Sequence, residues 1–341
     1  MSAYELLTGL AVPVVQAPMA GATTPAMAVA VTRAGGLGFL AAGYRPVDGL
    51  AADIAAVRDR TGGPFGVNVF VPGPDTAAPE RVAAYAERLR PDAARLGAEL
   101  GEPAWNDDAW TAKTELLLRD PVPAVTFTFG CPPADLVAGL RAAGSAVGVT
   151  VTTAAEARTA AEAGADFLCV QGAEAGGHQG SFSDDEERTV PLLDLLAGVR
   201  AATDLPLVGA GGIMAHEDVA RARAAGAVAA QCGTAFLRTP ESSAKAVHKT
   251  ALVHPEYRET AVTRAFSGRR ARGLVNGFLR AHDAEAPAAY PQVHYLTAPL
   301  RARAGVLDDA DALNLWAGTG HRRAVGIPAA EVVNWLARPG R

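Results

Sequence analysis

Residues 146–172 read AVGVTVTTAAEARTAAEAGADFLCVQG and contain the unit that decides the fold. A short run rich in β-branched residues, 146–151, precedes an alanine-rich helical stretch, 154–163, and a second apolar run, 167–172. Neither apolar run alternates with polar residues, which is typical of parallel strands buried on both faces. The stretch therefore predicts a strand, a helix and a second, parallel strand.

The same unit recurs on both sides of this stretch. Helix-period segments separate eight short apolar runs, which we predict as strands at 14–18, 37–42, 65–70, 124–130, 146–151, 167–172, 207–212 and 228–236. Eight strand–helix repeats predict an α/β fold, namely a (β/α)₈ TIM barrel. A doubly wound open sheet is the alternative.

Two regions interrupt this rhythm. Residues 98–120 contain Trp105 and Trp110 and predict an extra helix between the third and fourth strands. A tail of about a hundred residues follows the eighth strand, too long for one connection. We therefore predict a barrel over residues 1–238, a mainly helical element over 239–299 near the barrel mouth, and C-terminal helices over 300–341 that pack back on the barrel.

Composition narrows the class of protein. The 341 residues are 49% hydrophobic and carry a net charge of −5, which excludes general disorder and gives no electrostatic reason to bind nucleic acid. The three cysteines, Cys131, Cys169 and Cys232, are too scattered for a disulfide framework or a zinc site.

The uncharged stretch 6–32 could suggest a membrane span, but three prolines divide it into short runs. We therefore expect no membrane association and a soluble, cytoplasmic protein. The sequence leaves homo-oligomerisation open.

The predicted strand ends are poor in acids and bases. Lysine occurs only at positions 113, 245 and 249, none of them at a strand end, so a Schiff-base mechanism has no obvious lysine. The only acid or base candidates there are Glu174 and His178, too few for a metal site. Glycines and amides dominate instead, and such a site obtains its reactivity from an organic cofactor.

Two glycine turns indicate where that cofactor is held. GAGGI at 209–213 follows the seventh strand and GTAF at 233–236 closes the eighth. Loops after these two strands form the usual phosphate site of such barrels. The alternative is that the glycines only turn the corners between strands and helices.

His178 lies in the glycine-rich loop EAGGHQG at 174–180, after the sixth strand. The glycines permit close approach to a ligand, and an imidazole suits proton transfer near neutral pH. The alternative is a solvated loop histidine. His216 is expected to start a helix, whereas His294 is the tail histidine best placed to reach the mouth. A nucleophilic Cys131 would need a base partner that the sequence does not identify.

Taken in order, the motifs resemble the nitronate monooxygenase family, FMN-dependent (β/α)₈ barrels that are similar to the flavin-containing enoyl-ACP reductases. The resemblance covers nearly the whole chain. It rests on QAPMAG at 16–21, AGGLGFLAAGY at 34–44, GVNVF at 66–70, QGAEAGGH at 171–178, GGI at 211–213, GTAFL at 233–237, TRAFSG at 263–268 and LWAG at 315–318.

The resemblance implies a set of FMN-binding positions, with His178 as the catalytic residue. These positions are Ala17, Pro18 and Met19 at the flavin ring, Asn68 and Gln171 as its hydrogen-bond partners, Gly176 and Gly177 where the loop passes close to it, and Gly211, Gly212, Gly233 and Thr234 at its phosphate.

A second set is implied to border the substrate, namely Thr128, Ser267, Tyr290 and Tyr295. One position departs from the family. The bacterial branch commonly reads SFHFG after the fourth strand, whereas this chain reads TFTFG at 126–130, so that Thr128 replaces a histidine. A hydroxyl cannot act as a base near neutral pH, so the departure bears on the substrate.

Three functions follow from these observations. The first is FMN-dependent oxidation of a nitronate or nitroalkane by O₂ to a carbonyl compound and nitrite. The second is a related flavin oxidoreductase with a different substrate, in a biosynthetic or reductive role such as enoyl reduction. The third is a flavin-binding protein without turnover, with Trp105, Trp110 and the C-terminal tail as an interaction surface.

Overall fold

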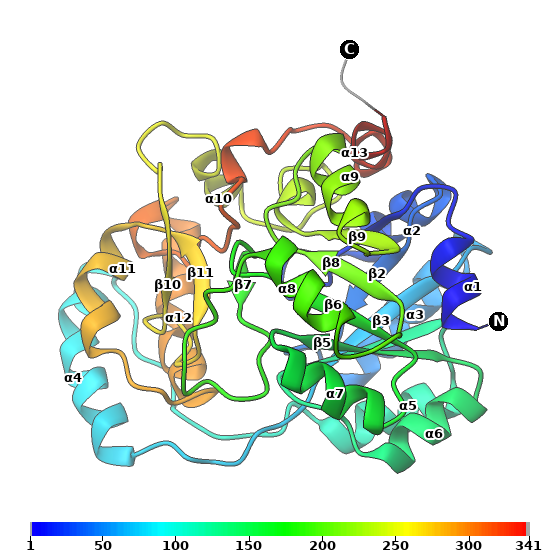
Figure 1. Ribbon diagram of the computed structural model, residues 1–341. Helices are drawn as coiled ribbons and strands as arrows, with labels where there is room; N and C mark the ends of the chain where they lie inside the picture. The colour runs from blue at the N-terminus through cyan, green and yellow to red at the C-terminus, as the bar shows by residue number, and fades with distance from the viewer. Residues whose placement is uncertain (1, 339–341) are drawn as a thin grey trace.

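The computed structural model describes residues 2–338 and contains the expected barrel (Figure 1). The eight-stranded parallel sheet has the order β1-β9-β8-β6-β5-β4-β3-β2. The two edges of this sheet, β1 and β2, are joined through Leu37, which precedes β2, and this closes the barrel. The Gln16 amide donates to the Leu37 carbonyl (2.9 Å), and the Leu37 amide donates to the Val14 carbonyl (3.0 Å). The strands are β1 (Val14–Gln16), β2 (Gly38–Ala41), β3 (Phe65–Phe70), β4 (Ala124–Thr128), β5 (Ala146–Val151), β6 (Phe167–Gln171), β8 (Leu207–Ala210) and β9 (Ala229–Cys232).

Helices surround the barrel as the (β/α)₈ pattern requires. They are α2 (Pro25–Arg33), α3 (Val47–Arg58), α5 (Trp110–Arg119), α6 (Ala134–Ala142), α7 (Ala154–Glu162), α8 (Leu192–Arg200) and α9 (His216–Ala224). His216 begins α9, as expected from the sequence. The short α1 (Ala3–Thr8) packs on buried residues at the amino ends of the strands, and α13 (Ala329–Ala337) packs against α2 and α9.

The stretch 146–172 forms β5, α7 and β6 for local reasons. Every residue of β5 is buried, because the strand packs on both faces. The Thr153 hydroxyl caps α7 by accepting a hydrogen bond from the Glu156 amide at 3.1 Å. Gly164, with φ +92°, ends this helical segment and lets the chain return to β6.

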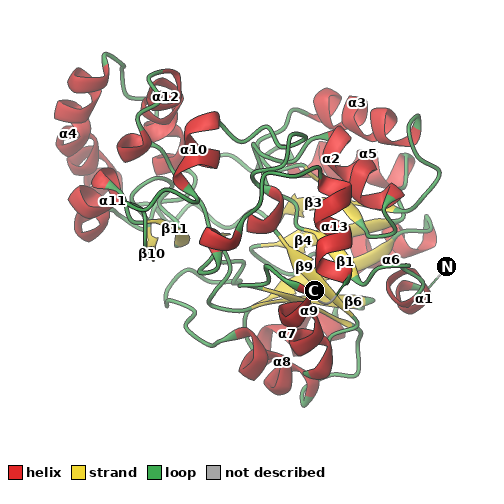
Figure 2. Ribbon diagram, turned by 90° about the horizontal axis from the view of Figure 1, so that it is seen from above, coloured by secondary structure: helices red, strands yellow, loops and turns green. Residues whose placement is uncertain are grey.

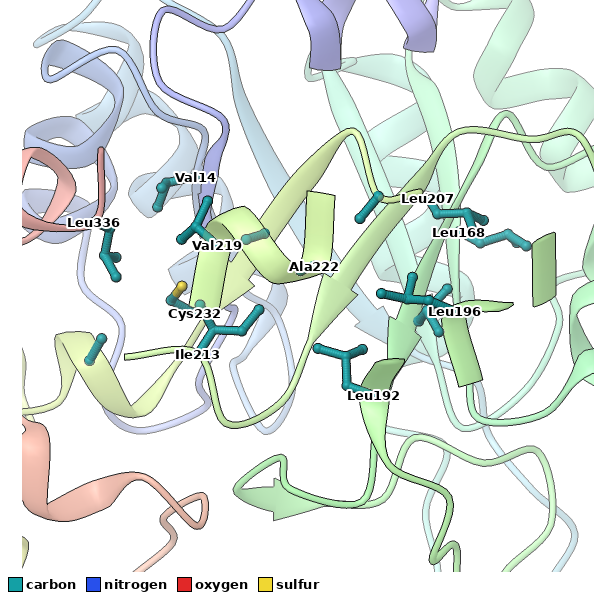
Figure 3. Packing of buried hydrophobic residues seen from close by; sticks show 14 of the residues in the cluster. Val14, Leu168, Leu192, Leu196, Leu207, Ile213, Val219, Ala222, Cys232 and Leu336 are labelled. Carbon is teal, nitrogen blue, oxygen red and sulfur yellow. The ribbon is translucent and has the colours of Figure 1, made fainter. Parts of the chain in front are cut away.

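The core between strands and helices is a cluster of buried apolar residues, some of which Figure 3 shows. Leu168 and Leu207 of adjacent strands pack with Leu192 and Leu196 of α8. Leu336 belongs to the same cluster, so the C-terminal helix α13 packs on this core. Replacing one of these leucines with alanine would leave a cavity and cost about 2–5 kcal/mol.

A second body lies beside the barrel (Figure 2), and we call it the accessory body. Its helices enclose their own apolar cluster, in which Tyr85 and Leu89 pack with Leu296 and Leu300. Its elements are α4 (Pro79–Leu96), α10 (Ala246–Ala251), β10 (Thr260–Thr263), β11 (Ala271–Leu274), α11 (Gly277–His282) and α12 (Gln292–Val306). The short η1 (Thr234–Phe236), η2 (Asp283–Glu285), η3 (Ala310–Ala312) and η4 (His321–Arg323) join neighbouring elements.

The accessory body differs from the sequence prediction in two ways. It includes α4, which the strand–helix rhythm assigned to the barrel, so that of the two helices between β3 and β4 only α5 packs on the barrel. Residues 239–299 contain the helices α10 and α11, the first part of α12 and the two short strands β10 and β11. The expected boundary at 299/300 falls inside α12, whose apolar face continues to Ala304.

The two bodies are joined by a three-stranded antiparallel sheet of β10, β11 and β7 (Gly177–His178). Strand β7 comes from the loop after β6, and His178 pairs with Ala271 of β11. Among residues 2–338, no helix is both long enough and apolar enough to span a bilayer.

Candidate active site

A cavity of about 760 Å³ lies at the carboxyl ends of the barrel strands, beneath residues of the accessory body. Each parallel strand, or for β1 the residue Ala17 that directly follows it, contributes to the lining, and this end of the barrel is the usual place of the active site in this fold. Fourteen residues predicted from the sequence line it: Ala17, Pro18, Met19, Asn68, Thr128, Gln171, Gly176, Gly177, His178, Gly211, Gly212, Gly233, Thr234 and Ser267.

One wall of the cavity is formed by the loops after β8 and β9. Within residues 2–338, the backbone N–H groups of Gly211, Gly212, Gly233 and Thr234 donate to no protein acceptor. Gly212 has φ +68°, a conformation that glycine adopts without strain. Unpaired backbone donors converging on one cavity suit an anion such as a phosphate.

The loop containing Gly318 completes this wall. The Gly318 amide donates to the Thr234 hydroxyl at 3.0 Å, so the loop after β9 and the C-terminal segment are tied together. A Cβ on Gly176 would lie 2.4 Å from the Gly318 nitrogen. Gly176 is therefore required for packing of two protein loops, whereas the sequence had suggested close approach to a ligand.

Polar side chains of β3, β4 and β5 line the floor. The Asn68 amide donates to the hydroxyls of Thr126 (3.0 Å) and Thr128 (2.9 Å), and the Thr128 hydroxyl lies 3.1 Å from that of Thr150. Asn68 is 4% exposed, and its Oδ1 atom has no donor among the described residues. A ligand N–H could satisfy this carbonyl, and Thr128 orients the amide that presents it.

Gln171 holds the loop that carries His178. Its Nε2 donates to the His178 carbonyl (3.1 Å), and its Oε1 accepts from the Gly180 amide (2.7 Å). On the other side, the Gln179 amide donates to the Arg270 carbonyl at 2.9 Å. The loop is thus fixed from both the barrel and the accessory body, and one Nε2 hydrogen of Gln171 is left for a ligand.

His178 and Ser267 form a hydrogen-bonded pair. The His178 Nε2 atom lies 2.8 Å from the Ser267 hydroxyl, which is 3.1 Å from the Arg269 carbonyl. Because the hydroxyl has one hydrogen and a carbonyl can only accept, Ser267 donates to Arg269 and accepts from His178. These two hydrogen bonds assign the proton of the neutral His178 ring to Nε2. The Nδ1 atom, which has no partner among the described residues, therefore presents a lone pair.

The surroundings keep this ring neutral. The rings of Phe129, Tyr290 and Trp316 lie 5.6–5.8 Å from it, centroid to centroid. Burial, followed by the positive charges of Arg269 and Arg301, lowers the pKa of His178 to about 3. At neutral pH the ring is therefore a proton acceptor and carries no charge.

The remaining substrate predictions have different outcomes. Tyr290 contacts the His178 ring and donates to or accepts from the Tyr44 hydroxyl at 2.8 Å. Neither Tyr290 nor Tyr295 is among the residues that line the cavity, and the Tyr295 ring packs edge-on against His294. The neighbouring His294 does line the cavity, as expected, and so does His248.

Sequence reasoning gave no role to Tyr44 and Arg301, both of which line the cavity. The Tyr44 ring stacks on His294 at 4.0 Å between centroids. The sequence offered one signal for Tyr44, because it follows a glycine just after β2, at the end of the strand where the cavity lies. The sequence offered no signal for Arg301, because its place in the cavity depends on which side of α12 faces the barrel.

Arg301 is a half-buried cation without a carboxylate partner in the described structure. Its Nε donates to Thr297 Oγ1 (3.0 Å), its Nη2 to the His294 carbonyl (2.7 Å), and Nη1 has no partner among residues 2–338. Burial lowers its pKa to about 10, so it stays charged at neutral pH. Asp53 is the one acidic side chain in the described lining, and Arg45 pairs with it at 2.8 Å.

The donor set fits an anionic aromatic cofactor better than a metal. Backbone N–H groups, amides and small side chains predominate, and no group of three or more His, Cys, Asp or Glu residues in the described chain could hold a metal ion. The cavity can therefore hold a phosphate at one end and a flat ring over the barrel floor, with His178 and Arg301 on the accessory side.

Comparisons with known proteins agree with this geometry. The nitronate monooxygenase family matches residues 4–338. A nitronate monooxygenase of Pseudomonas aeruginosa is 40% identical over 98% of this chain and 97% of its own, and a probable nitronate monooxygenase of Bacillus subtilis is 36% identical over 94% of both chains.

Two solved structures share the fold. Nitroalkane oxidase from Streptomyces ansochromogenes is 52% identical, with a TM-score of 0.95 over 97% of this chain and 96% of its own. FabK from Thermotoga maritima is 28% identical, with a TM-score of 0.75 over 98% of this chain and 94% of its own.

Proposed function

The chain belongs to the nitronate monooxygenase family, and from this premise we propose that it oxidises a nitronate, or the parent nitroalkane, with O₂ to a carbonyl compound and nitrite. The observation that carries the proposal is that a neutral histidine and a half-buried arginine without a carboxylate partner line the same cavity. A nitronate is an anion that the arginine attracts, and a nitroalkane has an acidic C–H that the histidine can deprotonate.

We propose FMN as the cofactor. The unpaired N–H groups of Gly211, Gly212, Gly233 and Thr234 would hold its phosphate, and Asn68 with residues 17–19 would border its ring. When bound, FMN would supply the redox chemistry, taking up electrons from the substrate and passing them to O₂.

The side chains of this protein would move the proton and hold the charge. His178 Nδ1 accepts the proton from the carbon beside the nitro group, while Ser267 keeps the Nε2 hydrogen engaged. Arg301 Nη1 is free to donate to an oxygen of the resulting nitronate. Phe129, Tyr290 and Trp316 exclude water around the ring, which strengthens both interactions.

The direct test is the absorbance spectrum of the purified protein, followed by turnover. We expect a yellow protein that releases FMN on denaturation and that forms nitrite from a nitronate while consuming O₂. A colourless protein that fails to bind added FMN would contradict the cofactor. The alternative function is an enoyl reductase. Oxidation of a reduced nicotinamide with an enoyl thioester, without nitrite from any nitronate, would favour that alternative.

Arg301 provides a prediction about the substrate's charge. Arg301→Met should raise the KM for a nitronate about tenfold or more, because a hydrogen bond to a charged group contributes about 1.5–3 kcal/mol. A neutral nitroalkane should be affected less. Arg301→Lys, which keeps the charge, is the matched control, and equal KM changes for both substrate forms would remove Arg301 from anion binding.

Ser267 provides a prediction about the tautomer. Ser267→Ala removes the acceptor of the His178 Nε2–H, so both tautomers and several ring orientations become accessible. We expect kcat/KM on a nitroalkane to fall about tenfold, because one lost hydrogen bond costs about 1 kcal/mol or slightly more. A nitronate, which needs no deprotonation, is the internal control; the same loss on both forms would contradict the assigned role.

A further inference from the structure

A largely buried ion pair lies outside the barrel strands, with the Lys113 and Asp108 side chains 1% and 18% exposed. Lys113 lies in α5, and its Nζ lies 2.8 Å from Asp108 Oδ2. Neither atom has another polar partner among the described residues. Removing two charges from water costs more than such a pair usually returns in stability, so stability alone does not account for it.

The carboxylate of this pair has a second contact. Asp108 Oδ1 accepts a hydrogen bond from the backbone N–H of Tyr44 at 3.0 Å. Tyr44 has φ +60°, a left-handed conformation that is rare for a bulky residue and costs about 1–3 kcal/mol. Asp108 therefore stabilises a backbone conformation that Tyr44 would not adopt by itself.

That conformation decides where the Tyr44 ring lies. The ring stacks on His294, and its hydroxyl lies 2.8 Å from that of Tyr290, whose ring contacts His178. His294 in turn receives the Arg301 guanidinium on its carbonyl. Tyr44 thus joins the two sides of the substrate space that contain the proposed base and the proposed anion site.

We propose that Asp108, held in place by Lys113, is a positioning residue that fixes Tyr44 and thereby the substrate-facing wall of Tyr44 and His294, together with the Tyr290 hydroxyl that Tyr44 contacts. The inference rests on the proposed function for its kinetic readout, because the wall borders the substrate. Asp108 has no role in flavin binding in this proposal, because Asp108 acts through Tyr44, whose ring stacks on His294 of the accessory body.

Two double variants test this inference. Asp108→Asn with Lys113→Met removes the charge pair but keeps a side-chain oxygen for the Tyr44 N–H. Asp108→Ala with Lys113→Met removes the charge pair and the acceptor together. Neither leaves a lone buried charge, and Asp108 itself has φ +55°, a left-handed conformation that the adjacent Ala109 also adopts at φ +54°.

The expected results differ between the two. The alanine variant should raise the KM for a nitronate about five- to tenfold, as expected for one lost hydrogen bond to a buried group, with kcat within about threefold and FMN still bound. The asparagine variant should keep KM within about threefold of the original protein. If both variants show the same KM, the acceptor for Tyr44 has no positioning role and the inference is overturned.

Hydrogen exchange provides a readout that needs no turnover. Amide exchange in the segment around Tyr44 should accelerate in the alanine variant and stay protected in the asparagine variant. Unchanged protection in the alanine variant would overturn the inference even if a nitronate is oxidised. If the original protein oxidises no nitronate, the proposed function fails, while the exchange result still decides whether Asp108 holds Tyr44.

Discussion

His178→Asn lowers kcat/KM on a neutral nitroalkane by about 10²–10⁴-fold, the usual contribution of a general base, and leaves FMN bound. Asparagine is close in size and polarity but cannot accept the proton. A pre-formed nitronate needs no deprotonation, so the loss on this substrate should be much smaller. The measurement is kcat/KM on both substrate forms, with the flavin content of each preparation determined from its absorbance.

The pH profile of the unaltered protein checks the same residue. Burial and the two nearby arginines lower the pKa of His178 to about 3, so the ring remains in its basic, neutral form as the pH falls from 8 to 5. A histidine with an ordinary pKa near 6.5 would lose that form over the same range. We therefore expect no acid limb from His178 between pH 5 and 8 in kcat/KM on a nitroalkane.

Two results would contradict this role. Equal, small losses on nitroalkane and nitronate would make His178 a loop histidine without a chemical function. Loss of flavin in the asparagine variant would make it structural, because β7 links the barrel to the accessory body.

Gly212→Asp weakens FMN binding at least about tenfold more than Gly212→Asn. Aspartate and asparagine have the same shape and both tolerate left-handed backbone, which matters because Gly212 has φ +68°. The matched pair therefore differs in one negative charge next to the proposed phosphate wall. Even at an effective dielectric of about 20, two unit charges about 6 Å apart repel by roughly 3 kcal/mol.

The measurement is the dissociation constant of FMN for each refilled apoprotein. Riboflavin, which lacks the phosphate, is the matched ligand and should bind both variants about equally. If aspartate and asparagine weaken FMN equally, steric effects explain the loss and the phosphate lies elsewhere.

The barrel could be predicted because its signal is local and repeated. Each strand–helix unit, such as 146–172, has its own apolar runs, helix cap and glycine, and parallel strands with helical crossovers have few other ways to close. The glycine turns 209–213 and 233–236 were likewise readable, since they follow consecutive strands of the same sheet. His178 could be identified because its loop continues directly from β6.

The accessory body could not be delimited in this way. The amphipathic pattern of α4 indicates that one face is buried, but it does not indicate which element covers that face. In the structure the face packs on α12, about two hundred residues later in the chain. The short strands β10 and β11 pair with each other, and β11 also pairs with the His178 loop, which is about ninety residues away in the sequence. Such pairings depend on contacts between distant segments, which sequence periodicity does not specify.

The sequence by itself therefore determined the barrel, the strand ends that form the cavity and the identity of its one histidine directly after a barrel strand. Tertiary structure alone decided the chemistry of that histidine: Ser267, distant in sequence, fixes the proton on Nε2, and Arg269 and Arg301 lower its pKa. It also decided the places of Tyr44 and Arg301. The physical reason is that hydrogen bonds and electrostatic interactions depend on distances in space, and the folded chain sets those distances between residues far apart along it.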